Sequence, residues 1–144
     1  MASVDLESGT KFCKINFGKF STPALVDSGA DISLISSITL KKVKPEFILQ
    51  KHAPLVQLKG VTGHWLNVLA RVMVKFKIGK KLLTHEFHVV QDLSKSMILG
   101  IDFMEKQNAT VDFGKKTLAI GDQIVVLRGK TGRTESRVCI SVCE

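Results

Sequence analysis

The 144-residue sequence predicts an all-β fold, and two features carry that prediction. Short apolar or alternating segments of strand length recur from Lys11 to Leu127, separated by turns that contain glycine. Segments with helical character are few and short. This pattern is typical of one all-β domain with one core, which a chain of this length can bury. We therefore expect a domain over residues 11–127, an N-terminal tail over 1–10, and a C-terminal tail or linker over 128–144 with room for a terminal strand.

In the first half of the chain, the predicted strands stand on both sides of an acidic turn. The expected elements are strands over 11–17, 20–26 and 32–35, a helical segment over 36–44 and a strand over 55–59. Pro23 lacks a backbone donor, so the second strand should be irregular or exposed there. Ser36 and Ser37 offer a helix N-cap and Pro45 ends the helix. Gly60 to Gly63 then forms the tip of a hairpin.

The second half has the clearest strand pattern. Residues 70–78 alternate between apolar and polar side chains, and 82–90 return after the turn at Gly79, with Leu83, Phe87 and Val89 on the buried side. Further along, we expect a strand at 97–100, one short helix from Asp102 to Gln107 with Asp102 as its cap, and a meander of strands over 110–113, 117–120 and 123–127. The apolar strands ending at Gly29 and Gly100 suggest two related halves, but the second half has no acid at the matching turn.

Composition limits the classes of function. The apolar runs are far shorter than the ~20 residues of a membrane span, and the N-terminal residues lack the pattern of a signal peptide, so we expect a cytoplasmic, reducing setting. The three cysteines offer neither a disulfide framework nor a metal tetrad, and the histidines show no metal-binding spacing beyond one His-x2-His pair. We expect no metal, with His52, His64, His85 and His88 as surface or strand residues.

The net charge of +8 is concentrated in one stretch. Residues 41–81 hold ten Lys or Arg and only Glu46 as an acid, which gives 10 − 1 = +9. A basic stretch can attract nucleic acid, but aromatic residues are few and no RNA-binding string accompanies it. A solvated lysine-rich face is therefore the favoured interpretation.

The chain is organised around the segment Ala24-Leu25-Val26-Asp27-Ser28-Gly29-Ala30. A carboxylate that directly follows two apolar strand residues must leave the core at a turn, because an unpaired buried charge costs several kcal/mol or shifts its pKa. Asp27 is therefore either paired or used in chemistry.

Three parts of the sequence together resemble the retropepsins, the aspartic proteases of retroviruses and LTR retrotransposons. They are Ala24 to Ala30, the glycine-bounded turn Gly60-Val61-Thr62-Gly63, and Ile98-Leu99-Gly100-Ile101-Asp102-Phe103. The resemblance covers roughly Lys11 to Leu127 in the order and spacing of the family. Ile101-Asp102-Phe103 after the glycine looks more like gypsy-class retrotransposon proteases or domesticated relatives than like many retroviral members.

The resemblance implies a closed, mostly antiparallel β-barrel that works as a homodimer, with one Asp27 from each subunit activating water to cleave an extended peptide or polyprotein. It implies no metal or organic cofactor and no membrane partner, and a location in the cytoplasm or within a retroelement particle. By the same resemblance Ser28, Gly29 and Ala30 support the catalytic loop and Asp31 lies at the edge of the substrate cleft.

The resemblance also assigns Gly60, Val61, Thr62 and Gly63 to a flap over the substrate, and places Ile98, Leu99 and Gly100 beneath the catalytic turn. Asp102 and Asp112 are interpreted as a helix cap and a turn residue. Trp65 is either a wall of a substrate pocket or part of the core.

Two alternatives to a protease remain. The chain can be an inactive or domesticated dimerisation or binding module with this fold, or, less favoured, a basic nucleic-acid-binding domain. A serine hydrolase is disfavoured because Gly-x-Ser-x-Gly is absent.

Overall fold

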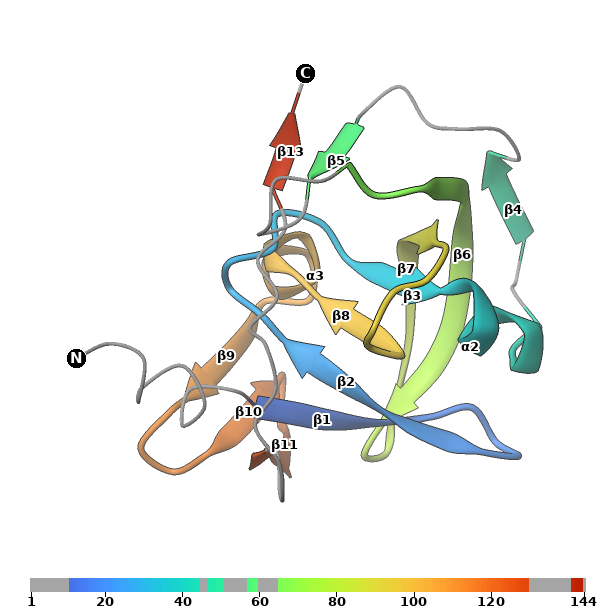
Figure 1. The fold of residues 1–144 in the computed structure, drawn as a ribbon. Helices are drawn as coiled ribbons and strands as arrows, with labels where there is room; N and C mark the ends of the chain where they lie inside the picture. Colours follow the sequence, from blue (N-terminus) through green and yellow to red (C-terminus); the bar gives the residue numbers. More distant parts are fainter. Residues whose placement is uncertain (1–10, 45–46, 51–56, 60–64, 130–140, 144) are drawn as a thin grey trace.

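The computed structural model describes residues 11–44, 47–50, 57–59, 65–129 and 141–143, and strands dominate it (Figure 1). The first half contains β1 (Lys11–Asn16), β2 (Ser21–Val26), β3 (Leu34–Ser36), α2 (Ser37–Lys42), β4 (Phe47–Gln50) and β5 (Gln57–Lys59). The second half contains β6 (Val68–Ile78), β7 (Lys81–Val90), β8 (Met97–Leu99), α3 (Ile101–Lys106), β9 (Ala109–Asp112), β10 (Thr117–Ile120), β11 (Gln123–Val126), β12 (Arg128–Gly129) and β13 (Ser141–Cys143).

Six strands close on themselves into a barrel. They follow the order β1, β2, β8, β3, β7 and β6, and β1 pairs again with β6 through Asn16 and Lys77. β12 and β4 extend this sheet beyond the ring, β9, β10 and β11 form a separate three-stranded sheet, and β13 pairs with β5. The prediction of an all-β, closed-barrel fold is confirmed.

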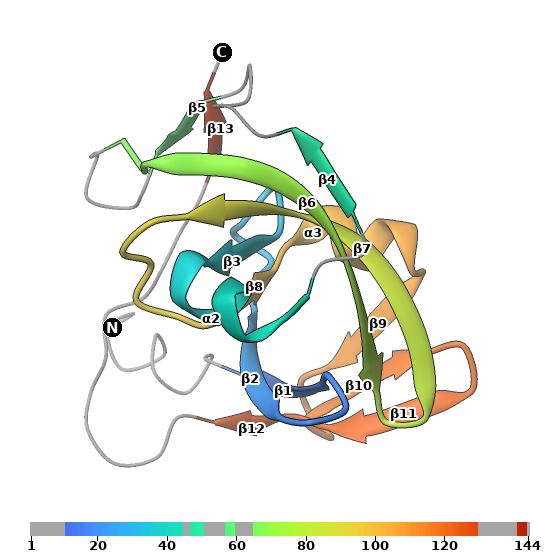
Figure 2. The same cartoon turned by 90° about the vertical axis from the view of Figure 1, so that its right-hand side faces the viewer.

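The long β6–β7 hairpin builds one side of the barrel and curves along it (Figure 2). Val72, Val74, Phe76 and Ile78 point into the core, as their alternation predicted. Phe76 stands within 6.2 Å, between ring centroids, of both Phe87 and Phe103. Burial of such side chains stabilises the fold by about 1.5–3 kcal/mol each, so this aromatic contact joins β6, β7 and α3 into one core.

The barrel contains two parallel pairings. β2 runs parallel to β8, with Val26 opposite Leu99, and β3 runs parallel to β7. β3 and β8 are antiparallel neighbours. The apolar strands of the two predicted halves therefore lie side by side, and their glycine turns meet at the same end. Pro23 is exposed and precedes the pairing with β8, which begins at Ala24.

Several element boundaries differ from the sequence prediction. The two six-residue helices α2 and α3 lie where a helical segment over 36–44 and a short helix over 102–107 were expected. α3 begins at Ile101 with Gly100 at its N-cap, so Asp102 is not the cap. β4 was not predicted at all. α2 does begin after Ser36, whose hydroxyl accepts a hydrogen bond from the Thr39 amide at 3.0 Å. In the described part of the chain, no helix has the length and apolar character needed to cross a membrane.

Candidate active site

Asp27 lies at the end of β2, in a turn that we call the Asp27 turn (residues 27–30). Its side chain is buried, with 8% of the residue exposed. Its Oδ1 accepts a hydrogen bond from the Gly29 amide at 2.8 Å, and its carbonyl accepts one from the Ala30 amide at 3.1 Å. These bonds fix the carboxylate relative to the backbone, because the turn folds back onto the acid that begins it.

The end of β8 holds the turn from the other side. The Asp27 amide donates to the Leu99 carbonyl at 3.0 Å, and the Ile101 amide donates to the Ala30 carbonyl at 2.8 Å. Gly100 lies between these two contacts. A Cβ at Gly100 would stand 2.7 Å from the carbonyl oxygens of Ala30 and Ile32, so only glycine allows this close approach of the two backbones.

The other predicted residues of the turn differ in exposure. Ser28 and Asp31 are exposed, Gly29 is partly buried, and Ala30 is fully buried. Ala30 packs in a small apolar cluster with Leu25 and Ile98, so its methyl group anchors the turn in the core. Of the predicted flap, Gly60, Val61, Thr62 and Gly63 lie outside the described residues, whereas Trp65 is described and 55% exposed, which excludes it from the core.

A second polar cluster, which sequence reasoning missed, adjoins the same turn. The Ser33 hydroxyl donates to Asp102 Oδ1 at 2.7 Å, and His85 Nε2 lies 3.1 Å from Asp102 Oδ2. Ser33 and His85 are both buried. His85 was expected to be a surface or strand residue, and it lies in strand β7 but not at the surface. Burial alone would raise the pKa of Asp102, but the hydrogen bonds from His85 and Ser33 outweigh it and hold that pKa below its usual value.

The remaining predicted polar residues have structural contacts or lie at the surface. Asp112 Oδ1 accepts from the Lys115 amide at 3.0 Å, as a turn residue does. Among the described residues, no three His, Cys, Asp or Glu side chains come together as metal ligands would. His52 and His64 lie outside the described residues.

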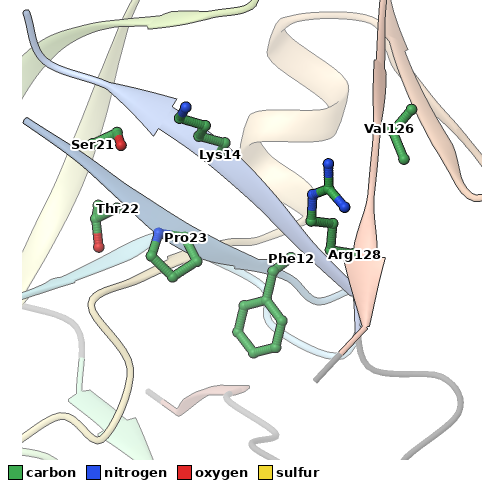
Figure 3. Close-up of a pocket in the computed structure, with 7 residues that line it drawn as sticks. All are labelled: Phe12, Lys14, Ser21, Thr22, Pro23, Val126 and Arg128. Carbon is green, nitrogen blue, oxygen red and sulfur yellow. The ribbon is translucent and has the colours of Figure 1, made fainter. Parts of the chain in front are cut away.

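A surface pocket of about 280 Å³ lies away from Asp27, between the start of β2 and the chain around β12 (Figure 3). Phe12, Pro23 and Val126 give it apolar walls, and Lys14 and Arg128 add positive charge. None of its lining residues belongs to the predicted site, and it holds no acid.

Comparison with known proteins agrees with this geometry. The sequence matches the PEG10/RTL1 protease domain family over residues 23–125. The retrovirus-related Pol polyprotein from transposon 412 of Drosophila melanogaster is 26% identical over 95 residues, which are 64% of this chain and 7% of that protein. The chain spans less than a third of the length of the curated relatives that it matches.

Solved structures show the same fold at low sequence identity. The retroviral protease-like domain of Ddi1 from Leishmania major superposes with a TM-score of 0.63 at 17% identity, covering 83% of this chain and 90% of that one. The EIAV protease, solved with the inhibitor HBY-793, gives a TM-score of 0.56 at 19% identity, covering 70% and 90%. The family match covers most of the chain and includes the Asp27 turn, which lies where β2 ends beside β8. This chain therefore belongs to the PEG10/RTL1 protease domain family and is retropepsin-like.

Proposed function

We propose that this chain is an aspartic endopeptidase that works as a homodimer, in which the Asp27 carboxylates of two subunits activate one water molecule. The proposed substrate is an extended peptide segment with apolar side chains near the scissile bond, within a polyprotein. Membership of a protease domain family supports the reaction class. The homodimer is inferred from the need for a second carboxylate, and the substrate is proposed from the resemblance to retropepsins.

The observation that carries the proposal is that the described residues place one aspartate, Asp27, in a turn suited to this reaction. Asp27 is buried in a turn and oriented by the Gly29 amide. At the matching end of β8 the chain has Gly100, and the nearby Asp102 uses both carboxylate oxygens to bind Ser33 and His85. The reaction requires two carboxylates that share a proton, and the described part of the chain places only Asp27 in a turn of this kind, so we infer that the second comes from another chain.

The chemistry follows from two acids a few ångströms apart, which cannot both be ionised and therefore share one proton. The ionised carboxylate takes a proton from water as the water oxygen attacks the scissile carbonyl carbon, and the protonated one donates to the carbonyl oxygen. The tetrahedral intermediate then breaks its C–N bond as the nitrogen receives a proton. The products are a carboxylic acid and an amine, so water is the only co-reactant.

The other residues of the predicted site have supporting roles in this proposal. Ser28, exposed beside Asp27, ties the two turns together across the dimer. Asp31 lies at the edge of the cleft, and the flap role that the resemblance assigns to residues 60–63 falls outside the described residues.

The test is cleavage of a fluorogenic peptide with apolar residues at the scissile bond, at mildly acidic pH and high protein concentration. We expect Asp27→Asn to reduce kcat/KM by roughly three orders of magnitude or more with an unchanged circular dichroism spectrum. The matched control is Asp112→Asn, which removes another turn carboxylate and should cleave like the wild type.

Two outcomes would contradict the proposal. Wild-type protein that is dimeric by sedimentation yet cleaves none of a diverse peptide library would instead be a binding module. Tight binding to single-stranded nucleic acid that weakens steeply with salt, without cleavage, would favour the nucleic-acid alternative.

A further inference from the structure

The cluster of Ser33, His85 and Asp102 gathers three separate parts of the fold at one point. Ser33 precedes β3, His85 lies in the middle of β7, and Asp102 is in the first turn of α3. The Asp102 carboxylate accepts from the Ser33 hydroxyl and contacts His85 Nε2, and its Oδ1 also accepts from the Phe103 amide at 2.7 Å. Asp102 is therefore held by groups from three elements.

The cluster is bonded directly to the chain that leaves the Asp27 turn. The Gly100 amide donates to the Ser33 hydroxyl oxygen at 3.0 Å, and the Asp102 amide donates to the Asp31 carbonyl at 3.3 Å. With the bond from the Ile101 amide to Ala30, three consecutive amides of the β8–α3 junction bind residues 30–33. Ser33 accepts from one side and donates to the other, so it links the junction to the Asp102 carboxylate.

Packing alone does not explain a histidine at position 85. The residue is 3% exposed, and its ring stands edge-on to Phe87 at 5.5 Å and to Phe103 at 5.3 Å between centroids. Its Nδ1 is buried without a hydrogen-bond partner among the described residues. An apolar ring would fill this space without that desolvation. The contact that an apolar ring cannot make is the one from Nε2 to Asp102.

We propose that His85 and Ser33 are positioning residues for the reaction at Asp27: they orient the Asp102 carboxylate, which keeps the β8–α3 junction and the Asp27 turn in the geometry that the second subunit must meet. This inference rests on the proposed protease function. It adds a role for β7, a strand that contributes nothing else to the predicted site. Small displacements of reacting groups lower the rate of a reaction far more than they weaken substrate binding.

The test compares two substitutions at one position. His85→Phe keeps an aromatic ring beside Phe87 and Phe103 but removes the donor to Asp102, whereas His85→Gln keeps a donor and loses the ring. We expect His85→Phe to remain folded and to lose kcat by roughly tenfold or more, with KM changed by less than about twofold. His85→Gln should recover most of that loss in kcat even if its thermal midpoint is lower, because the donor is restored.

A second measurement does not depend on activity. Amide hydrogen exchange of Asp27, Ala30 and Ile101, followed by NMR, should be faster by about tenfold or more in His85→Phe than in the wild type. Amides of the β10–β11 hairpin pair within the sheet of β9, β10 and β11 and should exchange at the wild-type rate in both proteins. Ser33→Ala should give the same pattern, because it removes the acceptor of the Gly100 amide.

The outcomes separate the two proposals. If wild-type protein that is dimeric by sedimentation does not cleave peptides but the exchange pattern appears, the protease function fails and the positioning of the turn stands. If wild type cleaves and His85→Phe has wild-type kcat, the positioning role is overturned. It is also overturned if His85→Phe and His85→Gln lose kcat equally while turn exchange is unchanged, since packing alone would then explain the loss.

Discussion

Gly100 lies where β8 meets the Asp27 turn, and the backbone there leaves no space for a side chain. The nearest atoms to an added Cβ are carbonyl oxygens of Ala30 and Ile32, which cannot move without moving the turn itself. At Gly100 the backbone of the Ile-Leu-Gly segment contacts the backbone of residues 30–32. Glycine is required there because a side chain would not fit, and not because the backbone has a left-handed conformation.

Gly100→Ala should lower the free energy of unfolding by about 2 kcal/mol or more, because the clash forces the turn and the junction apart. Urea denaturation measures the change. The matched control is Gly114→Ala, where the added Cβ would meet only the Asp112 carboxylate at 3.4 Å, and it should be close to neutral. If Gly100→Ala and the wild type had equal free energies of unfolding, the β8–α3 junction could accommodate a side chain and the prediction would be wrong.

At the scale of elements, β7 is unusual because its last four residues, Phe87 to Val90, are all buried. Successive strand residues point to opposite faces, so this burial shows that both faces of β7 are covered toward its end. It therefore carries two buried imidazoles, His85 on the core side and His88 on the other side. Burial lowers the pKa of His88, with Arg71 adding to this and Glu86 and Asp102 opposing it.

A histidine whose folded-state pKa is depressed contributes stability that is fully present above its unfolded value of about 6.5. That stability is lost as the pH falls from there through the folded-state pKa, because the unfolded chain binds the proton more readily. We expect the free energy of unfolding to fall as the pH drops below about 6.5, and His88→Gln to reduce that slope by at most ~1.4 kcal/mol per pH unit. Urea titrations at several pH values measure the slopes, and identical slopes would contradict the prediction.

In the whole molecule, the barrel places one acidic turn, the Asp27 turn, at the ends of β2 and β8. The proposed reaction needs two carboxylates. Activity should therefore depend on association. We expect specific activity to rise with protein concentration and to level off once sedimentation shows full dimer formation. A monomer that cleaves with constant specific activity would overturn the shared pair of acids.

Mixing provides the control for that prediction at fixed wild-type concentration. Excess Asp27→Asn subunits should lower the cleavage rate, since mixed dimers hold one carboxylate and one amide. Excess Asp112→Asn subunits should not lower it, because their dimers with wild type keep both acids.

Elements whose signal is local could be predicted from the sequence. Alternation placed β6 and β7 and their buried faces, glycines marked the turns, and the order of the acidic turn and the Ile-Leu-Gly segment identified the family. These signals could be read because strand periodicity and turn preference depend on neighbouring residues. The position of Asp27 at the end of a buried strand followed from the same pattern.

Which polar groups contact one another could not be predicted, because it depends on how distant segments pack. Ser33 and Asp102 are 69 positions apart, and His85 is 17 from Asp102, so no local pattern connects them. Asp102 looked like a helix cap and His85 like an ordinary strand or surface residue, because residue type indicates what a side chain can bind but not what the fold brings to it. The pairings of β3 with β7 and with β8 bring those partners together, and pairing between distant strands is set by how the whole barrel buries its core.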